Sequence, residues 1–133
     1  MLINLDLLSV GIAVAAIGIL GFIIFFSRPR SVTNRSFLLF SLLTIIWGIS
    51  NYFNYQIRSS DLALWILRTH LFISIWHAFS FFLLSYVLPK EEVRFSRIFK
   101  FFILPIVILT SLIVLTPLGF SKISVLPSPG ETA

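Results

Sequence analysis

The stretch that decides the fold runs from residue 7 to residue 26 and reads LLSVGIAVAAIGILGFIIFF. It contains no charged side chain, and its one polar side chain is the hydroxyl of Ser9. At 1.5 Å per residue, a helix of this length spans about 30 Å, the thickness of the hydrocarbon core of a bilayer. A membrane β-barrel would instead show alternating segments of about 10 residues. The run therefore predicts a transmembrane helix, because lipid offers the backbone no hydrogen-bond partners.

Three further apolar runs of similar length follow, and the composition of the whole chain agrees with them. Hydrophobic residues make up 58% of the 133 residues and charged residues only 11%, whereas soluble domains are about 25% charged. This composition excludes a soluble globular domain and a disordered chain. We predict an all-α polytopic membrane protein, with a single membrane domain over residues 1–133 and four transmembrane helices at about 5–26, 37–55, 64–88 and 98–118.

The ends of these runs carry residues that start or stop helices. The first run ends at Arg28–Arg30, and Ser31, Thr33 and Asn34 are candidate N-caps for the second helix. The third and fourth runs end at Pro89 and Pro117, since proline has no amide hydrogen to continue a helix. Pro105 lies within the fourth run, and we expect it to kink that helix.

Basic residues are distributed unequally between the two sides of the predicted membrane domain. The first and third connections hold seven Lys and Arg residues, and the opposite side holds three. Because the side richer in Lys and Arg faces the cytoplasm, both termini are expected outside. Residues 119–133 then form an external loop or tail that stops without a further domain, so we expect a truncated chain. The predicted cytoplasmic residues are Arg28, Arg30, Arg35, Lys90, Arg94, Arg97 and Lys100.

Polar side chains inside a membrane are unfavourable, so each one is a candidate functional residue. His70, Ser74 and His77 are spaced i, i+4 and i+7 and share one face of the third helix. We expect His70 near the outer surface and His77 near the midplane. Asn51 and Asn54 lie one turn apart near the outer end of the second helix. These five residues predict an outward-facing polar pocket between the two helices. The alternative is that they form interhelical hydrogen bonds that only stabilise packing.

Small residues on the first helix predict a packing surface, because Gly11, Ala15 and Gly18 let another helix approach closely. The sequence contains no cysteine and no motif of a known catalytic or metal site. The two histidines are about 10 Å apart along the helix axis, too far to share one ion. We therefore expect no catalytic residue, metal or cofactor in this chain. We also expect no nucleic-acid partner, because the basic residues lie in short clusters between apolar runs.

Several short motifs resemble those of a known family. They are Phe25–Ser31 (FFSRPRS), the central Trp47-Gly48, Leu64–Arg68 (LWILR), Leu115–Pro117 (LTP) and an external segment from Val125 to Gly130. Over residues 12–130 the chain resembles the N-terminal seven-helix membrane region of bacterial sensor histidine kinases, which is sometimes fused to diguanylate cyclases. The resemblance implies helices one to four of seven, with a cytoplasmic effector in the parent protein. No phosphoacceptor-histidine segment and no ATP-binding domain are present in the 133 residues.

The sequence leads to one expected function and two alternatives. We expect a sensory or receptor module of a two-component system in the bacterial cytoplasmic (inner) membrane, which transduces a signal without catalysis in this chain. Its expected partners are the lipid bilayer and either a second copy of the chain or the missing helices and kinase domain. The alternatives are a small four-helix transporter and a membrane subunit that binds a partner protein.

Overall fold

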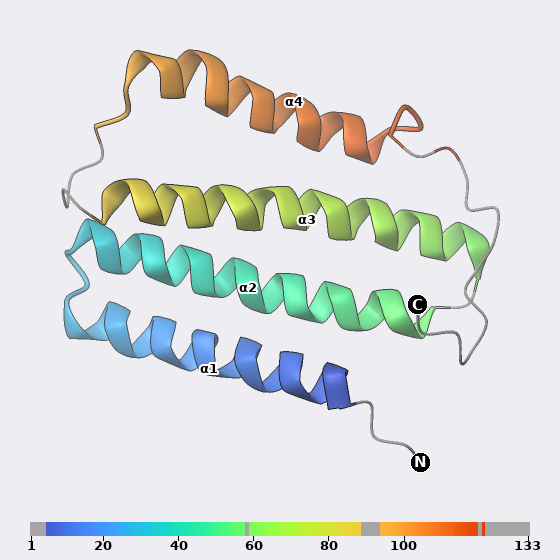
Figure 1. Ribbon diagram of the computed structural model, residues 1–133, viewed down its shortest axis with the longest axis horizontal. Coiled ribbons are helices and arrows are strands. Elements are labelled where there is room, and N and C mark those ends of the chain that lie inside the picture. The colour runs from blue at the N-terminus through green and yellow to red at the C-terminus, as the bar shows by residue number, and fades with distance from the viewer. Residues whose placement is uncertain (1–4, 58, 89–93, 120, 122–133) are drawn as a thin grey trace.

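The computed structural model describes residues 5–57, 59–88, 94–119 and 121, and their regular structure is all-helical (Figure 1). The all-α prediction is confirmed over these residues. Most of the predicted tail, residues 119–133, lies outside them, as do Arg58 and Lys90. The helices are α1 (Leu5–Ser27), α2 (Val32–Gln56), α3 (Ser60–Val87), the π-helical segment η1 (Phe99–Ile103) and α4 (Leu104–Leu115).

Three of these helices are long and apolar enough to cross a membrane. Helices α1, α2 and α3 have 23, 25 and 28 residues, so each is at least about 34 Å long. The fourth apolar helix, Phe99–Leu115, is shorter than the predicted span of 98–118. At about 25 Å it falls below the usual hydrocarbon thickness of about 30 Å. It ends early because Thr116 precedes a proline and adopts an extended conformation.

Helices α2 and α3 begin about one turn before the apolar runs that predicted them. The Ser31 hydroxyl accepts a hydrogen bond from the Asn34 amide, and the Ser59 hydroxyl accepts one from the Leu62 amide, both at 3.4 Å. These side chains cap the helix starts by satisfying backbone donors that lack a helical partner. The first turns of α2 and α3 contain polar residues, so apolar periodicity alone predicts helix starts that are too late in the chain.

The fourth helix changes type just before Pro105. The Leu104 amide donates to the carbonyl of Phe99, five residues earlier, which is a π-helical bond. Pro105 cannot donate, so the α-helical ladder is interrupted at this position. Where we expected a kink, the described structure has this π-helical segment followed by an α-helix with proline in its first turn.

The helices form an open layer in chain order (Figure 1). Helix α2 packs between α1 and α3, and α4 packs on the other side of α3. Within the described part of the chain, α1 contacts only α2, and α4 contacts only α3 and the continuous η1. A closed four-helix bundle would bring α1 against α4. Among the described residues, the layer therefore encloses no central channel and leaves the outer faces of α1 and α4 without a helical neighbour.

Burial in this layer is the reverse of burial in a soluble protein. The interfaces bury small hydroxyl residues such as Ser41, Thr44 and Ser80, whose side chains donate to carbonyls of their own helices. Large apolar side chains lie on the outside, with Phe26 72% and Phe101 73% exposed. Such continuous apolar surface is stable only when lipid or another apolar surface covers it. This arrangement supports a multi-pass membrane protein.

Candidate functional site

Helices α2 and α3 are joined by a hydrogen-bonded seam near the middle of both helices. The seam has three rungs, and each rung connects one α2 side chain to one α3 side chain. Consecutive rungs are three or four residues apart, about one helical turn. Position numbers rise along α2 as they fall along α3, as antiparallel helices require. We call this set the polar seam: Thr44–His77, Trp47–Ser74 and Ser50–His70.

The first rung joins Thr44 of α2 to His77 of α3. The Thr44 Oγ1 and His77 Nε2 atoms are 2.9 Å apart. The Thr44 hydroxyl donates its proton to the carbonyl of Phe40 at 2.8 Å. Because that proton is already used, His77 must be the donor in the rung. The geometry therefore assigns a proton to His77 Nε2.

The second rung uses the same chemistry with the helices exchanged. The Trp47 indole of α2 donates from Nε1 to the Ser74 hydroxyl of α3 at 3.1 Å. The Ser74 hydroxyl in turn donates to the carbonyl of His70 at 2.8 Å. In both rungs, a hydroxyl bonded to its own helix accepts from a ring N–H of the neighbouring helix. Both acceptors are thus oriented by a backbone carbonyl.

The third rung and the ring contacts complete the seam. His70 Nδ1 lies 3.2 Å from the hydroxyl oxygen of Ser50. The His77 ring is stacked between Phe40, at 5.1 Å and 12°, and Trp47, at 5.7 Å and 20°. Trp47 also contacts the ring of His70 at 5.8 Å. The rings of Trp47, His70 and His77 are therefore held by ring contacts as well as by a hydrogen bond, and together these contacts fix the orientation of each ring.

The seam lies deep in both helices. Thr44 is at the midpoint of α2, whose bounds are Val32 and Gln56. His70 and His77 are each ten residues from an end of α3, or about 15 Å along the axis. Because α3 starts at Ser60, before the start of the predicted helix, His70 lies further from the end of α3 than the sequence indicated. The two histidines are equally deep in α3.

The structure brings the predicted α3 residues together with α2 residues other than the predicted Asn51 and Asn54. His70, Ser74 and His77 all face α2. The Asn51 and Asn54 side chains make no hydrogen bond to any described residue, so they are not rungs of the seam. Their place is taken by Thr44, Trp47 and Ser50, of which we expected only Trp47 near the pocket, as part of its wall.

A groove lies beside the seam, and it is apolar where we predicted a polar pocket. Its volume is ≈ 270 Å³, and the histidines do not line it. Ser50 belongs to both the groove and the seam, so it is the point where the two features meet. The groove is lined by Ile46, Ile49, Ser50, Phe53, Ile66, Thr69 and Ile73.

The seam can respond chemically through its two imidazoles. Protonation of an imidazole makes both ring nitrogens donors. At His77 it adds a donor at Nδ1 beside the Nε2–H that already bonds Thr44, and at His70 it makes Nδ1 a donor toward the Ser50 hydroxyl. The carboxylates of the described chain are Asp6 and Asp61, which lie in the first turns of α1 and α3. Both are far from the seam along the helices, and the described residues contain no group of metal-binding side chains. The seam is therefore suited to a change of hydrogen bonding.

The α1–α2 interface uses one of the three predicted small residues. A Cβ atom at Gly18 would lie 2.8 Å from the Ile45 side chain, and one at Gly21 would collide with Ser41. Gly11 has nothing within 4 Å of the corresponding position, and Ala15 is exposed. The packing surface is thus shifted toward the C-terminal half of α1, where Gly21 replaces Gly11 and Ala15.

The order of the helices determines where the basic residues lie. The six described members of the predicted cytoplasmic set lie at the end of the layer formed by the α1–α2 loop and the start of η1 (Figure 1). The seventh, Lys90, lies outside the described residues. Arg68 is only 5% exposed, and its guanidinium lies over the Trp65 ring at 5.2 Å.

Comparisons with models of protein families, with curated proteins and with solved structures find no match for this chain. The polar seam and the open layer are therefore the observations from which its function is argued.

Proposed function

We propose that the chain is a sensory or receptor module of a membrane protein and that the polar seam is its responsive element. One observation carries the proposal. The His77 imidazole is hydrogen-bonded to Thr44 and stacked between two aromatic rings, in the middle of two apolar helices. A titratable ring at such a depth is unfavourable in a purely structural role. A sensor, in contrast, needs a group whose bonding a stimulus can change.

The free energy of the hydrogen bonds in the seam is similar to the free energy that a stimulus can supply, as a switch requires. An interhelical hydrogen bond in a membrane contributes about 0.6 kcal/mol on average. Three rungs therefore contribute about 2 kcal/mol. Moving one charge through 100 mV of membrane potential is worth about 2.3 kcal/mol. The α2–α3 contact thus has two states of similar free energy, one with the seam formed and one with the seam broken. A proton, a bound ligand or an electric field can shift the equilibrium between them, provided that it acts differently on the two states.

The open layer supports transmission to a partner. Helices α1 and α4 each have one helical neighbour in the described residues, so their outer faces can receive a second copy of the chain or further helices. This arrangement agrees with the resemblance to the membrane region of sensor histidine kinases. We include in the proposal four membrane spans, both termini outside and the bacterial cytoplasmic membrane as the location. The same outer faces favour the second candidate function, a membrane subunit that binds a partner protein.

The functional proposal predicts a spectroscopic response without transport. We would replace Trp65 and Trp76 with phenylalanine, so that Trp47 alone reports on the seam in proteoliposomes. External acidification, a membrane potential or a changed bilayer thickness should shift Trp47 emission, since Trp47 contacts both histidines. His77→Leu in the same background should abolish the shift. The measurement is steady-state fluorescence recorded together with solute flux.

Each outcome of this experiment separates the candidate functions. An emission shift that needs His77 and occurs without flux supports the sensor. Solute flux that is lost in His77→Leu supports the transporter alternative and contradicts the sensor. No shift under any of the three stimuli also contradicts the proposal. In that case, stable co-purification of one membrane partner would favour the subunit.

The proposed orientation makes a separate prediction. The chain has no cysteine, so single cysteines can be introduced without background. Ser59→Cys should react with a membrane-impermeant maleimide on intact cells, because Ser59 lies between α2 and α3 on the proposed outer side. Ser31→Cys should react only after the membrane is permeabilised. The opposite pattern would reverse the orientation, and equal labelling of both would contradict a single topology.

A further inference from the structure

The net charge of the protein is concentrated at one end of the helical layer. The α1–α2 and α3–η1 connections lie at this end (Figure 1). By sequence, this end carries seven Lys and Arg residues and two acids, Glu91 and Glu92. The remainder of the chain carries three basic and three acidic residues. The whole formal net charge of +5 therefore belongs to one end.

The basic side chains of the α1–α2 loop and of the first turn of α2 have no acidic neighbour among the described residues. Arg28, Arg30 and Arg35 are all exposed. The described carboxylates, Asp6 and Asp61, lie in the first turns of α1 and α3 at the opposite end of the layer. The length of α1, about 34 Å, separates the two groups. These arginine charges are open to an external anion.

A bilayer that covered the exposed apolar surface would place its phosphate groups at the level of the loop. Phe26 is 72% exposed, which marks lipid-facing surface one turn or less below the loop. Arg28 is two residues further along, a rise of about 3 Å. On the other connection, Arg97 and Lys100 are next to Ile98 and Phe101, which are 67% and 73% exposed. Both groups of basic residues thus border the apolar surface directly.

The backbone of the loop is held in place by α2. The Asn34 side chain donates to the carbonyls of Ile24 at 2.7 Å and Arg28 at 3.3 Å. The Arg35 Nε donates to the carbonyl of Pro29 at 2.8 Å. These bonds join the first turn of α2 to the end of α1 and to the loop, and they fix the path of the loop. The loop is therefore preorganised, so that binding an anion needs little further ordering of the backbone.

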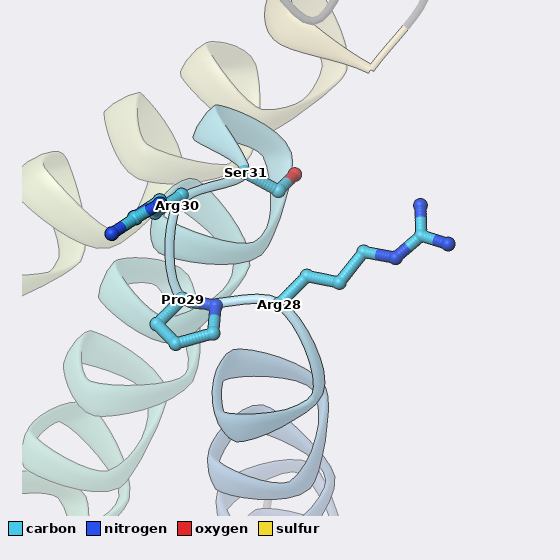
Figure 2. Close-up of a pocket in the computed structure, with 4 residues that line it drawn as sticks. All are labelled: Arg28, Pro29, Arg30 and Ser31. Carbon is cyan, nitrogen blue, oxygen red and sulfur yellow. The ribbon is translucent and has the colours of Figure 1, made fainter.

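The two arginine side chains of this loop extend in opposite directions (Figure 2). They border an open hollow of ≈ 400 Å³ formed by Arg28, Pro29, Arg30 and Ser31. Arg28 extends to the same side as the Ser31 hydroxyl, and Arg30 extends to the opposite side. The Ser31 oxygen accepts from the Asn34 amide, so its own proton remains to be donated. One anion cannot be held by both guanidinium groups in this arrangement.

We propose that the α1–α2 loop binds the headgroups of two anionic phospholipids, one on each side of the loop. Arg28 and Ser31 contact the phosphate of one lipid, and Arg30 contacts that of another. Guanidinium groups pair with phosphate oxygens in a bidentate manner, and basic clusters beside a membrane helix select anionic lipids. The loop thereby anchors the α1–α2 pair and makes its position sensitive to the charge of the surrounding leaflet.

The test uses the full chain in nanodiscs of equimolar phosphatidylcholine and phosphatidylglycerol. Spin-labelled forms of the two lipids give their relative association with the protein. We expect a preference for phosphatidylglycerol that falls about five-fold or more in Arg28→Gln/Arg30→Gln, since each basic side chain near a membrane surface contributes a factor of about five. Arg58→Gln, which removes a charge from the α2–α3 connection, is the matched control and should keep the preference. An equal loss in Arg58→Gln, or no loss in the double variant, would overturn the proposal.

Two further arms distinguish a lipid headgroup from free phosphate and from a defect in folding of the variant. Excess inorganic phosphate should leave the preference unchanged relative to sodium chloride of the same ionic strength. If phosphate abolishes it, the loop binds free phosphate and the lipid assignment is wrong. The wild-type chain alone supplies a test that does not depend on folding of a variant. Photoactivatable phosphatidylglycerol should cross-link to the segment 28–31 more than photoactivatable phosphatidylcholine does, and equal cross-linking would overturn the proposal.

Discussion

Gly21→Leu should lower the free energy of unfolding by about 1–3 kcal/mol, the usual effect of overfilling a packed interface. Gly21 is buried in the α1–α2 interface, and a Cβ atom there would collide with the side chain of Ser41. Ser41 cannot easily move away, because it is 1% exposed and its hydroxyl donates to the carbonyl of Phe37. A leucine must therefore push α1 away from α2. Reversible unfolding in mixed micelles measures the change.

Gly11→Leu is the matched control on the same helix. It introduces the same side chain and gains the same intrinsic helix propensity, about 1 kcal/mol relative to glycine. A Cβ atom at Gly11 would meet nothing within 4 Å. We expect this variant to be as stable as the wild type or more stable. Equal destabilisation by both substitutions would show that the α1–α2 contact is not the one described.

Trp47→Ala should be the most damaging single change in the polar seam, with a loss of about 2–3 kcal/mol. It removes one interhelical hydrogen bond, worth about 0.6 kcal/mol. It also removes two ring contacts, with His70 and His77, each worth about 0.5–1.5 kcal/mol. Unfolding measurements on the variant would give the loss directly. A loss below about 0.5 kcal/mol would mean that Trp47 does not join the two helices.

Smaller changes at the same rung divide this loss into its parts. Trp47→Phe keeps the stacked ring but removes the indole donor, so it should lose about 0.6 kcal/mol. Ser74→Ala removes the acceptor of the same bond and should lose a similar amount. The double variant should lose less than the sum, because both substitutions delete one interaction. Additive losses would contradict a direct Trp47–Ser74 bond.

The helices themselves could be predicted from the sequence, because continuous apolar runs have few alternatives in lipid. Their ends were harder to predict. The first turn of α2 contains Thr33, Asn34 and Arg35, which are helical in the structure but interrupt an apolar run. The caps at Ser31 and Ser59 decide these starts. At the other end of the chain, the consequence of Pro105 was predicted as a kink, but periodicity could not specify a π-helical segment.

The α3 side of the seam was visible as the i, i+4, i+7 stripe of His70, Ser74 and His77. The α2 side was not, because a stripe on one helix does not fix the level of its neighbour. One signal was available in the short connection between α2 and α3. Because the connection is short, residues at equal distances from it lie at about the same level in the two helices. His70 is ten residues after the start of α3. The α2 position ten residues before Gln56 is within about one turn of Ser50, the partner of His70.

The packing face of α1 shows the same limitation. Gly11, Ala15 and Gly18 form a regular stripe in the sequence, yet α2 contacts α1 through Val14, Gly18 and Gly21 instead. Both stripes have helical spacing and small residues. The choice between them depends on the partner, because Gly48 of α2 receives the Val14 side chain. Such complementarity between two helices cannot be inferred from one helix alone.

We propose that α2 and α3 meet within a membrane in the register of the polar seam. The most direct measurement is cross-linking of paired cysteines in the cysteine-free chain, in liposomes, with a short thiol-specific reagent. Ser50→Cys with His70→Cys should cross-link within one chain, because these side chains form a rung. Ser50→Cys with His77→Cys should not, because His77 lies about 10 Å further along α3. Efficient cross-linking of the second pair without the first would contradict the register and the account built on it.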